Sequence, residues 1–262
     1  MYARLSSGLI DPECMGTPDG AARDRAATTR DLGYVSKMSS FVIVGGGGFA
    51  TEILDIVDTL NAAGGDFDVT GIVAEPEPNM DAIGDYGVPF LGGLGVLRDL
   101  PAAIGYVIAI GLGGGGHRAR IDALLAGRPS PILVHPTATT GRGVALGPGS
   151  VVCSHVSLGS HVSLGRHVHV GANTPVGHDS VLEDYATVSP LVAVSGNVTV
   201  GARATVGTGA AIRQRTRIGA GAFVGAGAVV VSDVPPGVTV VGVPARAKDQ
   251  GQRRAPLLAH DT

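Results

Sequence analysis

A histidine followed at once by a carboxylate, His178-Asp179, is the pair in this sequence best suited to proton transfer. A neutral imidazole can take a proton from an attacking amine or hydroxyl, and an adjacent carboxylate can fix the tautomer and orientation of the ring. We therefore expect His178 to act as a general base with Asp179 beside it. The alternative is an ordinary surface histidine.

Three further histidines, His155, His161 and His167, recur every six residues and suggest a zinc site. Residues six apart in an extended chain are separated by up to ~20 Å, whereas zinc ligands lie within about 2.1 Å of the metal. One chain therefore does not bring these three rings to one ion, and we assign no metal ligands. We predict solvent-facing corner positions; a zinc site shared between chains is the alternative.

Two glycine-rich segments are suited to binding phosphate. Gly45-Gly46-Gly47-Gly48 follows the apolar run 41–44, and Gly111 opens a second glycine run after another apolar segment. If both turns end parallel strands, their backbone N–H groups and the following helix N-termini face one crevice. We predict a nucleotide site there, with Glu75 in reach of a base or ribose. Tight structural turns and a solvated loop acid are the alternatives.

The segment Gly45-x-Gly47-x-x-Ala50 also satisfies the dinucleotide-binding pattern. Residues 41–133, however, have room for one mononucleotide-binding half rather than the two that a dinucleotide spans. The turn also contains no Arg or Lys to hold a triphosphate. NAD-dependent chemistry and sugar nucleotidyl transfer are therefore not expected.

The glycine turns need a small parallel sheet to position them. Strands are predicted at 41–44, Val69–Val73 and Tyr106–Ile110, because these are short apolar runs bounded by glycine or polar residues. Apolar residues at helical spacing from Ile53 to Leu60, and the pattern of Arg118–Ala126, predict helices between and after them. This alternation is typical of a Rossmann-like parallel α/β domain.

The element that carries His178 has a different signature, a period of six residues. A period of six fits a short strand plus a corner, with one aliphatic side chain pointing inward on each side, so the chain must coil. Fifteen positions in register make a chance pattern untenable. The aliphatic positions are Leu146, Val152, Leu158, Leu164, Val170, Val176, Leu182, Val188, Val194, Val200, Val206, Ile212, Ile218, Val224 and Val230.

A coil of stacked strands has open ends that must be covered. We expect the first domain to cap one end and the segment 238–246 to cap the other. The sequence thus divides into a disordered extension (1–40, with Met38 as a candidate start), the α/β domain (41–133), the coiled domain (134–247) and a flexible tail (248–262).

The composition fits a chain of many tight corners, since 42 of 262 residues are glycine and only 4% are aromatic. The net charge of −3 argues against a nucleic-acid-binding surface or a polybasic membrane anchor and favours a small-molecule partner. The two cysteines, Cys14 and Cys153, form no CxxC motif, which fits the reducing cytoplasm.

Several motifs in this order resemble one family, the bacterial sugar O- and N-acetyltransferases of the hexapeptide-repeat type, which includes sialic acid O-acetyltransferases and UDP-amino-sugar N-acetyltransferases. The resemblance covers residues 41–247. It is carried by the glycine turn after 41–44, Ala109-Ile110-Gly111 with Arg118, Val134-His135-Pro136, Gly177-His178-Asp179 and the segment 240–246.

The resemblance implies a left-handed parallel β-helix of five three-sided coils, assembled as a homotrimer. It implies that acetyl-CoA or another acyl-CoA lies in a groove between neighbouring β-helices, and that a nucleotide sugar lies at the first domain. His178 would be the catalytic base, and Asp179 would be the acidic residue beside it. Gly171 and Thr187 depart from the family pattern, which commonly has Asn and a second His there.

Residues implied to meet the substrates follow from the same resemblance. Gly196 and Gly207 would permit close approach of the pantetheine arm, and Arg246 would meet CoA phosphates. Arg213, Arg215 and Arg217 are a further phosphate candidate or a solvated basic edge. Gly45, Gly46, Gly47, Gly48, Glu75, Gly111 and Thr187 are the residues assigned to the acceptor.

The predicted function is therefore transfer of an acyl group to an amino or hydroxyl group of a nucleotide-linked sugar or a similar small metabolite. The alternatives are a metal-dependent lyase of the γ-carbonic-anhydrase type on the same helix, and a catalytically weak binding or scaffolding trimer.

Overall fold

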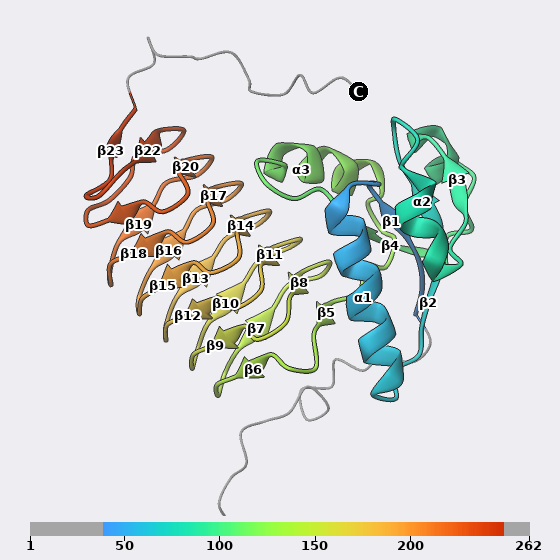
Figure 1. The fold of residues 1–262 in the computed structure, drawn as a ribbon, viewed down its shortest axis with the longest axis horizontal. Helices are drawn as coiled ribbons and strands as arrows, with labels where there is room; N and C mark the ends of the chain where they lie inside the picture. Colours follow the sequence, from blue (N-terminus) through green and yellow to red (C-terminus); the bar gives the residue numbers. More distant parts are fainter. Residues whose placement is uncertain (1–38, 249–262) are drawn as a thin grey trace, which may run out of the picture.

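The computed structural model describes residues 39–248, which form a small α/β domain beside a long three-sided coil (Figure 1). The predicted fold class, a Rossmann-like parallel α/β domain followed by a left-handed parallel β-helix, is confirmed by the strand pairings. The predicted disordered extension and flexible tail lie outside the described residues, apart from their innermost positions. The division of the domains at residue 133/134 remains a prediction.

The α/β domain is built on one four-stranded parallel sheet of order β3-β2-β1-β4. The central strand β1 is the continuous apolar run of the sequence, and its residues 41–44 are fully buried because the sheet is covered on both faces. The elements are β1 (Ser39–Val44), α1 (Gly48–Ala62), β2 (Phe67–Val73), α2 (Met80–Ile83), η2 (Gly84–Tyr86), β3 (Phe90–Gly92), η3 (Leu94–Arg98), β4 (Gly105–Ile108) and α3 (Gly115–Leu124).

The coiled domain consists mostly of two-residue strands that stack into three parallel sheets, one for each side of the triangle. One face packs against the α/β domain and is called the docking face. It contains β5 (Leu133–Val134), β8 (Val151–Val152), β11 (His169–Val170), β14 (Thr187–Val188), β17 (Thr205–Val206), β20 (Phe223–Val224), β22 (Thr239–Val241) and the antiparallel β23 (Arg246–Ala247). The second face contains β6 (Thr139–Thr140), β9 (Ser157–Leu158), β12 (Pro175–Val176), β15 (Ala193–Val194), β18 (Ala211–Ile212) and β21 (Val229–Val230). The third face contains β7 (Ala145–Leu146), β10 (Ser163–Leu164), β13 (Val181–Leu182), β16 (Thr199–Val200) and β19 (Arg217–Ile218).

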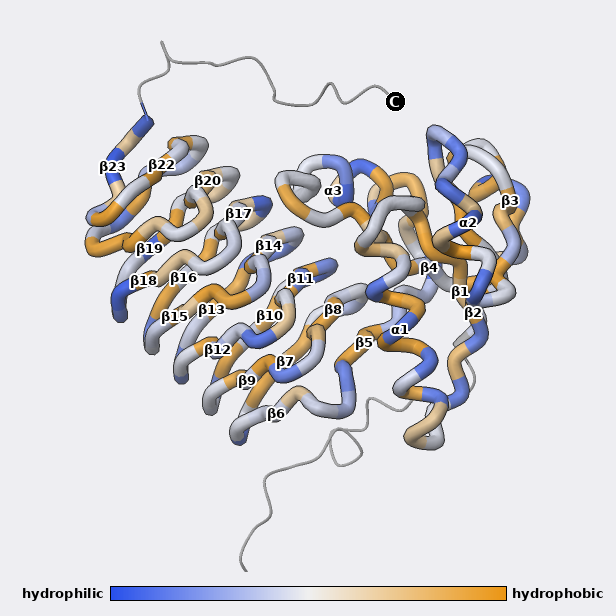
Figure 2. Tube along the Cα trace, in the orientation of Figure 1, coloured by the Kyte–Doolittle hydropathy of each residue, from blue (hydrophilic) through white to orange (hydrophobic). Residues whose placement is uncertain are grey.

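The period of six is explained by what each position does in the coil. The aliphatic residue of each repeat points inward and joins one continuous core along the helix axis. Figure 2 shows apolar stretches recurring with the strands and hydrophilic ones at the corners. The glycine that often follows the aliphatic residue is required by close stacking: a Cβ on Gly207 would lie 2.7 Å from the backbone nitrogen of Ala226 in the next coil.

Every corner from residue 143 to residue 227 turns through a residue with left-handed backbone, and residues 18 apart stack into three columns. The column between the second and third faces contains Gly143, His161, Asp179, Asn197 and Arg215, with φ between 57° and 69°. The column between the third and docking faces contains Gly149, His167, Tyr185, Arg203 and Gly221. The column between the docking and second faces contains His155, Asn173, Leu191, Gly209 and Gly227.

Two expectations about the ends of the coil differ from the structure. The stack is longer than the fifteen repeats, because β5 and β6 precede them, with buried Thr140 in place of an aliphatic residue. The α/β domain does not cap an end. It packs against the side of the coil, where Leu133, Val151 and Cys153 of the docking face share a core with α1 and β1. Their side chains point outward from the coil and are apolar, so they need this cover.

Candidate active site

The His178-Asp179 pair lies at the corner between the second and third faces, between β12 and β13. His178 Nδ1 and Asp179 Oδ2 are 2.6 Å apart. The corner is held from both neighbouring coils: the Asp179 N–H donates to the Ser160 carbonyl, and the Asn197 N–H donates to the His178 carbonyl. The pair faces outward, with side-chain exposures of 64% and 46%. The structure thus brings together the two residues that the sequence singled out.

The hydrogen bond assigns the proton on the imidazole. The pKa of Asp179 is lowered from its ordinary value, first by the hydrogen bond from His178 and also by one from His161, so the group is a carboxylate at neutral pH. A carboxylate only accepts, so Nδ1 of His178 carries the proton. This leaves Nε2 with a free lone pair directed away from the acid, as a general base requires.

Two glycines make room for histidine rings at this corner. A Cβ on Gly196 would lie 2.7 Å from Nε2 of His178, and a Cβ on Gly143 would lie 2.7 Å from Cδ2 of His161. Gly196 therefore contacts the proposed base directly. Sequence analysis missed the second ring, His161, whose Nδ1 is 3.3 Å from Asp179 Oδ1.

The glycine turns form a second site in the α/β domain, a cavity of about 810 Å³. It is lined by the ends of β1, β2 and β4 and by α3, and includes Gly45, Gly46, Gly47, Glu75 and Gly111 of the predicted residues. Gly48 is not part of the lining. Glycine is required at residue 45, since φ is +121° and a Cβ would lie 2.7 Å from the Ala109 carbonyl oxygen.

The cavity is suited to an anionic ligand. The helix α1 begins at Gly48, directly after the lining residue Gly47, so the positive end of its dipole lies near the cavity. His117 and Arg120 line it from the first turns of α3. Arg120 was not predicted; it lies three residues after His117 on α3, which puts both on one side of the helix.

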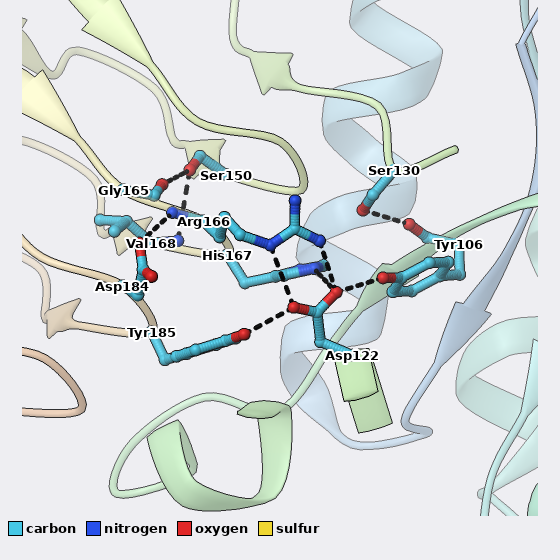
Figure 3. A network of polar contacts seen from close by, with 10 residues as sticks. All are labelled: Tyr106, Asp122, Ser130, Ser150, Gly165, Arg166, His167, Val168, Asp184 and Tyr185. Atoms are coloured by element: carbon cyan, nitrogen blue, oxygen red, sulfur yellow. Dashed lines mark hydrogen bonds and ion pairs between the residues drawn. The ribbon is translucent and has the colours of Figure 1, made fainter. Parts of the chain in front are cut away.

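A buried polar network joins the two domains (Figure 3). Asp122 of α3 accepts hydrogen bonds from Tyr106, from Tyr185 at 2.5 Å, and from Arg166 at 2.7 and 3.1 Å. Burial would raise its pKa, but the hydrogen bonds from Arg166, Tyr106 and Tyr185 outweigh burial, and the pKa of Asp122 is well below the usual range.

The same network corrects one of our predictions. His167 occupies a corner as expected but is fully buried rather than solvent-facing, because its corner points at the α/β domain. Its Nε2 lies 3.0 Å from Asp122 Oδ1, and its ring stacks on Tyr185 and Tyr106. His155 and His161 are exposed, as predicted.

Arg118 links the floor of the cavity to the coil. Its guanidinium donates to the carbonyls of Ile110 at 2.6 Å and Tyr185, and to Thr187 Oγ1 at 2.8 Å. Burial lowers the pKa of Arg118 to about 10, which still leaves it charged at neutral pH. Thr187, predicted to meet the acceptor, is 5% exposed beneath this side chain and does not line the cavity.

The remaining predicted residues lie apart from both sites. A Cβ on Gly207 would meet backbone atoms of the next coil, so this position faces the neighbouring coil. Arg246 is exposed on β23, where it donates to the adjacent Ala245 carbonyl. Gly171, like Gly207, faces the backbone of the next coil, at Pro190.

The cavity and His178 are on opposite sides of the coil. The α/β domain covers the docking face, as the Phe49–His169 ring contact and the Arg118–Thr187 hydrogen bond show. His178 lies at the corner between the other two faces, which in a three-sided prism is the edge opposite the docking face. A ligand in the cavity of one chain therefore does not face the His178 of that chain.

The described part of the chain contains neither a metal-binding cluster nor a membrane-spanning helix. Within residues 39–248, no group of three His, Cys, Asp or Glu side chains is arranged to hold a metal ion. None of the helices in this range is long and apolar enough to cross a membrane.

Comparisons with known proteins agree with this architecture. No protein-family model and no curated protein matches the sequence. Among solved structures, the chain is similar to the acetyltransferase domain of PglB from Neisseria gonorrhoeae FA1090, with 30% identity, a TM-score of 0.70 and coverage of 80% of this chain and 99% of that one. It is similar to PerB from Caulobacter crescentus in complex with CoA and GDP-perosamine, with 30% identity, a TM-score of 0.69 and coverage of 81% and 99%. WeeI from Acinetobacter baumannii AYE matches at 28% identity and a TM-score of 0.68, with coverage of 80% and 100%. The predicted resemblance is thereby confirmed, and the chain belongs to the bacterial sugar acetyltransferases of the hexapeptide-repeat type.

Proposed function

We propose that this protein transfers an acetyl group from acetyl-CoA to the amino group of a nucleotide-linked amino sugar. The observation that carries the proposal is the His178–Asp179 pair, 2.6 Å apart on an exposed corner of a hexapeptide-repeat acetyltransferase. Support for the substrates comes from the similar structures, which are described with acetyl coenzyme A and with CoA and GDP-perosamine.

In the proposed reaction, Nε2 of His178 accepts a proton from the amine while the amine nitrogen attacks the thioester carbonyl. The new C–N bond forms, the C–S bond breaks, and the thiolate of CoA takes up the proton held by the imidazolium. Asp179 stabilises the imidazolium, because an adjacent negative charge favours the protonated ring. A hydroxyl acceptor would follow the same proton path and is an outcome that the experiment below distinguishes.

We assign the nucleotide diphosphate of the acceptor to the glycine-lined cavity. The N-terminus of α1 and the guanidinium of Arg120 supply positive potential for the phosphates, and His117 can donate a hydrogen bond to them. Glu75 is on the cavity rim and is our candidate for a ribose or base contact. For acetyl-CoA, Gly196 is the best supported of the predicted contacts because it adjoins His178. Gly207 and Arg246 are our further proposed contacts for acetyl-CoA.

We propose that the active enzyme is a homotrimer in which the cavity of one chain serves the His178 of a neighbour. The support is geometric, since the cavity and His178 are on opposite sides of one coil and only a second chain can bring the two functions together. We also propose a cytoplasmic location, where acyl-CoA and nucleotide sugars are available. The free thiol of Cys153 is consistent with it.

The decisive experiment is steady-state kinetics of His178→Ala with acetyl-CoA and a panel of GDP-, UDP- and dTDP-linked amino sugars and their hydroxyl analogues. We expect kcat to fall at least ~100-fold with little change in acetyl-CoA binding, since general-base catalysis is typically worth 10²–10⁴. His155→Ala, an exposed corner histidine in another column, is the matched control. A near-normal kcat in His178→Ala would exclude this histidine as the base.

Mixing two inactive variants tests the shared site. Gly47→Glu should fold, because nothing lies within 4 Å of its Cβ direction, but should repel phosphate. Refolding or exchanging Gly47→Glu chains with His178→Ala chains should restore activity if sites are shared between chains. No recovery in verified mixed oligomers would contradict the shared site.

A further inference from the structure

The carboxylate of Asp179 contacts two histidines. Its Oδ2 lies 2.6 Å from Nδ1 of His178, and its Oδ1 lies 3.3 Å from Nδ1 of His161. His161 and Asp179 are 18 residues apart and stack in the same corner column, with φ of 60° and 58°. Both oxygens of the carboxylate are therefore engaged by imidazoles from two successive coils.

The arrangement of glycines indicates that the second ring has a defined place. His161 lies over Gly143, the residue below it in the column, where a Cβ would stand 2.7 Å from the ring. Left-handed backbone alone does not require glycine at that position, because Asn197 and Arg215 adopt it in the same column. The glycine thus matches the space that the His161 ring occupies, as Gly196 matches the ring of His178.

The carboxylate of Asp179 needs a second hydrogen-bond donor to hold it in one orientation. Its side chain is 46% exposed on an outward corner, where its only other hydrogen bond from a side chain in the described range comes from His178. A carboxylate held through one oxygen can rotate, and a catalytic group must be held close to its productive geometry. A second donor on the other oxygen fixes the plane of the carboxylate.

We propose that His161 is a positioning residue that holds Asp179 in the orientation facing His178. It acts through Asp179 and does not touch substrate, so the chain of contacts runs His161–Asp179–His178. The proposal rests on the proposed function of His178 as the base. The hydrogen bond from His161 also contributes to the lowered pKa of Asp179, after that from His178.

The test compares His161→Ala with His161→Asn in the full chain. The amide nitrogen of Asn occupies nearly the position of Nδ1 in His, so Asn restores the donor without the ring. We expect His161→Ala to lower kcat about 3- to 10-fold, as for loss of one ordinary hydrogen bond, and to leave KM for acetyl-CoA unchanged. His161→Asn should recover most of the loss. His155→Ala controls for removal of an exposed corner histidine.

Two further measurements separate positioning from a structural role. In an Asp179→Asn background, His161→Ala should cause no additional loss, because its partner is already disabled. The ¹⁵N NMR shifts of His178 should show the Nδ1–H tautomer in the wild type and a larger share of Nε2–H in His161→Ala.

The outcomes are distinct. Wild-type kcat in His161→Ala, an equal loss in the Asn and Ala variants, additive losses with Asp179→Asn, or an unchanged His178 tautomer would each overturn the role of His161. If His178→Ala itself keeps its kcat, the proposed function fails, whereas the tautomer measurement still decides whether His161 orients Asp179.

Discussion

The imidazole of His178 occupies the space that a side chain on Gly196 would fill. The backbone of Gly196 does not have the left-handed conformation that demands glycine, and a Cβ there would lie 2.7 Å from Nε2. The absence of a side chain at this position therefore serves the ring of His178. Two residues 18 apart in sequence act as one structural unit at the corner.

We predict that Gly196→Ala lowers kcat about 10- to 100-fold, because the methyl group displaces the ring and small misplacements of catalytic groups are costly. The exposed ring can move aside, so Tm should stay near that of the wild type. Kinetics and thermal unfolding check both parts. Gly84→Ala, whose Cβ would meet nothing within 4 Å, is the control. An unchanged kcat would mean that the ring position is not limiting.

Arg118 is predicted to stabilise the junction between the domains. Arg118→Met removes the donor shared by Ile110, Tyr185 and Thr187, and leaves buried carbonyls unpaired. We expect the free energy of unfolding to fall by about 2–3 kcal/mol. Thr187→Val removes one acceptor and leaves the carbonyls bound, so it should cost about 1 kcal/mol. Urea unfolding of both variants measures the difference, and equal losses would contradict it.

Stability is predicted to depend on pH through His169. Neither ring nitrogen has a side-chain hydrogen-bond partner among the described residues. Burial, with the charges of Arg118 and His167, lowers the pKa of His169 well below its ordinary value, against a weaker opposing effect of the Ile108 backbone. The unfolded chain binds a proton near pH 6.5 that the folded chain does not, so stability is present above about pH 6.5 and is lost as pH falls below it.

The test of this pH dependence is His169→Phe, which keeps the ring contact with Phe49 and removes the titrating group. We expect a smaller fall in Tm between pH 7 and pH 5 than in the wild type. Some dependence should remain, since burial also lowers the pKa of His167. His155→Phe, at an exposed corner, should reduce the fall in Tm much less than His169→Phe does. An equal fall in His169→Phe and the wild type would show that His169 does not contribute.

The register of the coil predicts a sharp contrast between inward and outward positions. Val200 is fully buried in the core column, so Val200→Asp should place an unpaired charge among aliphatic side chains and unfold the domain. Val181→Asp, at an outward position that is 39% exposed, should be tolerated. Circular dichroism and thermal melts compare the two. A folded Val200→Asp would contradict the assigned register.

The coil can be predicted well from the sequence because every repeat has an aliphatic residue at the same position. An inward aliphatic residue recurs in all fifteen repeats, and glycine follows it in nine of them, so the pattern is clear without any single residue. The fifteen repeats begin at Leu146, so β6 was not counted among them although it lies inside the predicted coiled domain. Thr140 stands where the rule expects an aliphatic residue, and the buried threonine is recognisable only from its stacking below Leu158.

The site was predicted in part. His178 and Asp179 are adjacent, so sequence alone pairs them. His161 contacts Asp179 because one coil contains 18 residues, and a search at that spacing would have found it. The interactions of Asp122 with Arg166, His167 and Tyr185 carry no such signal, because they depend on which face of the coil the α/β domain covers. The strand β3 was missed because three residues are too few for a periodic pattern.

Because corner residues 18 apart stack in one column, insertions and deletions of 18 residues preserve the columns and shorter ones do not. Loss or duplication of 18 codons within the coil keeps every later residue in its own column, whereas a change of six moves each corner residue to the next edge of the prism. A duplication placed after Arg203, beyond the residues that contact the α/β domain, would lengthen the coil by one rung, about 4.8 Å. Whole-coil insertions and deletions in that part of the chain therefore change the length of the coil in fixed steps without altering the domain junction or the pairing of His178 with Asp179.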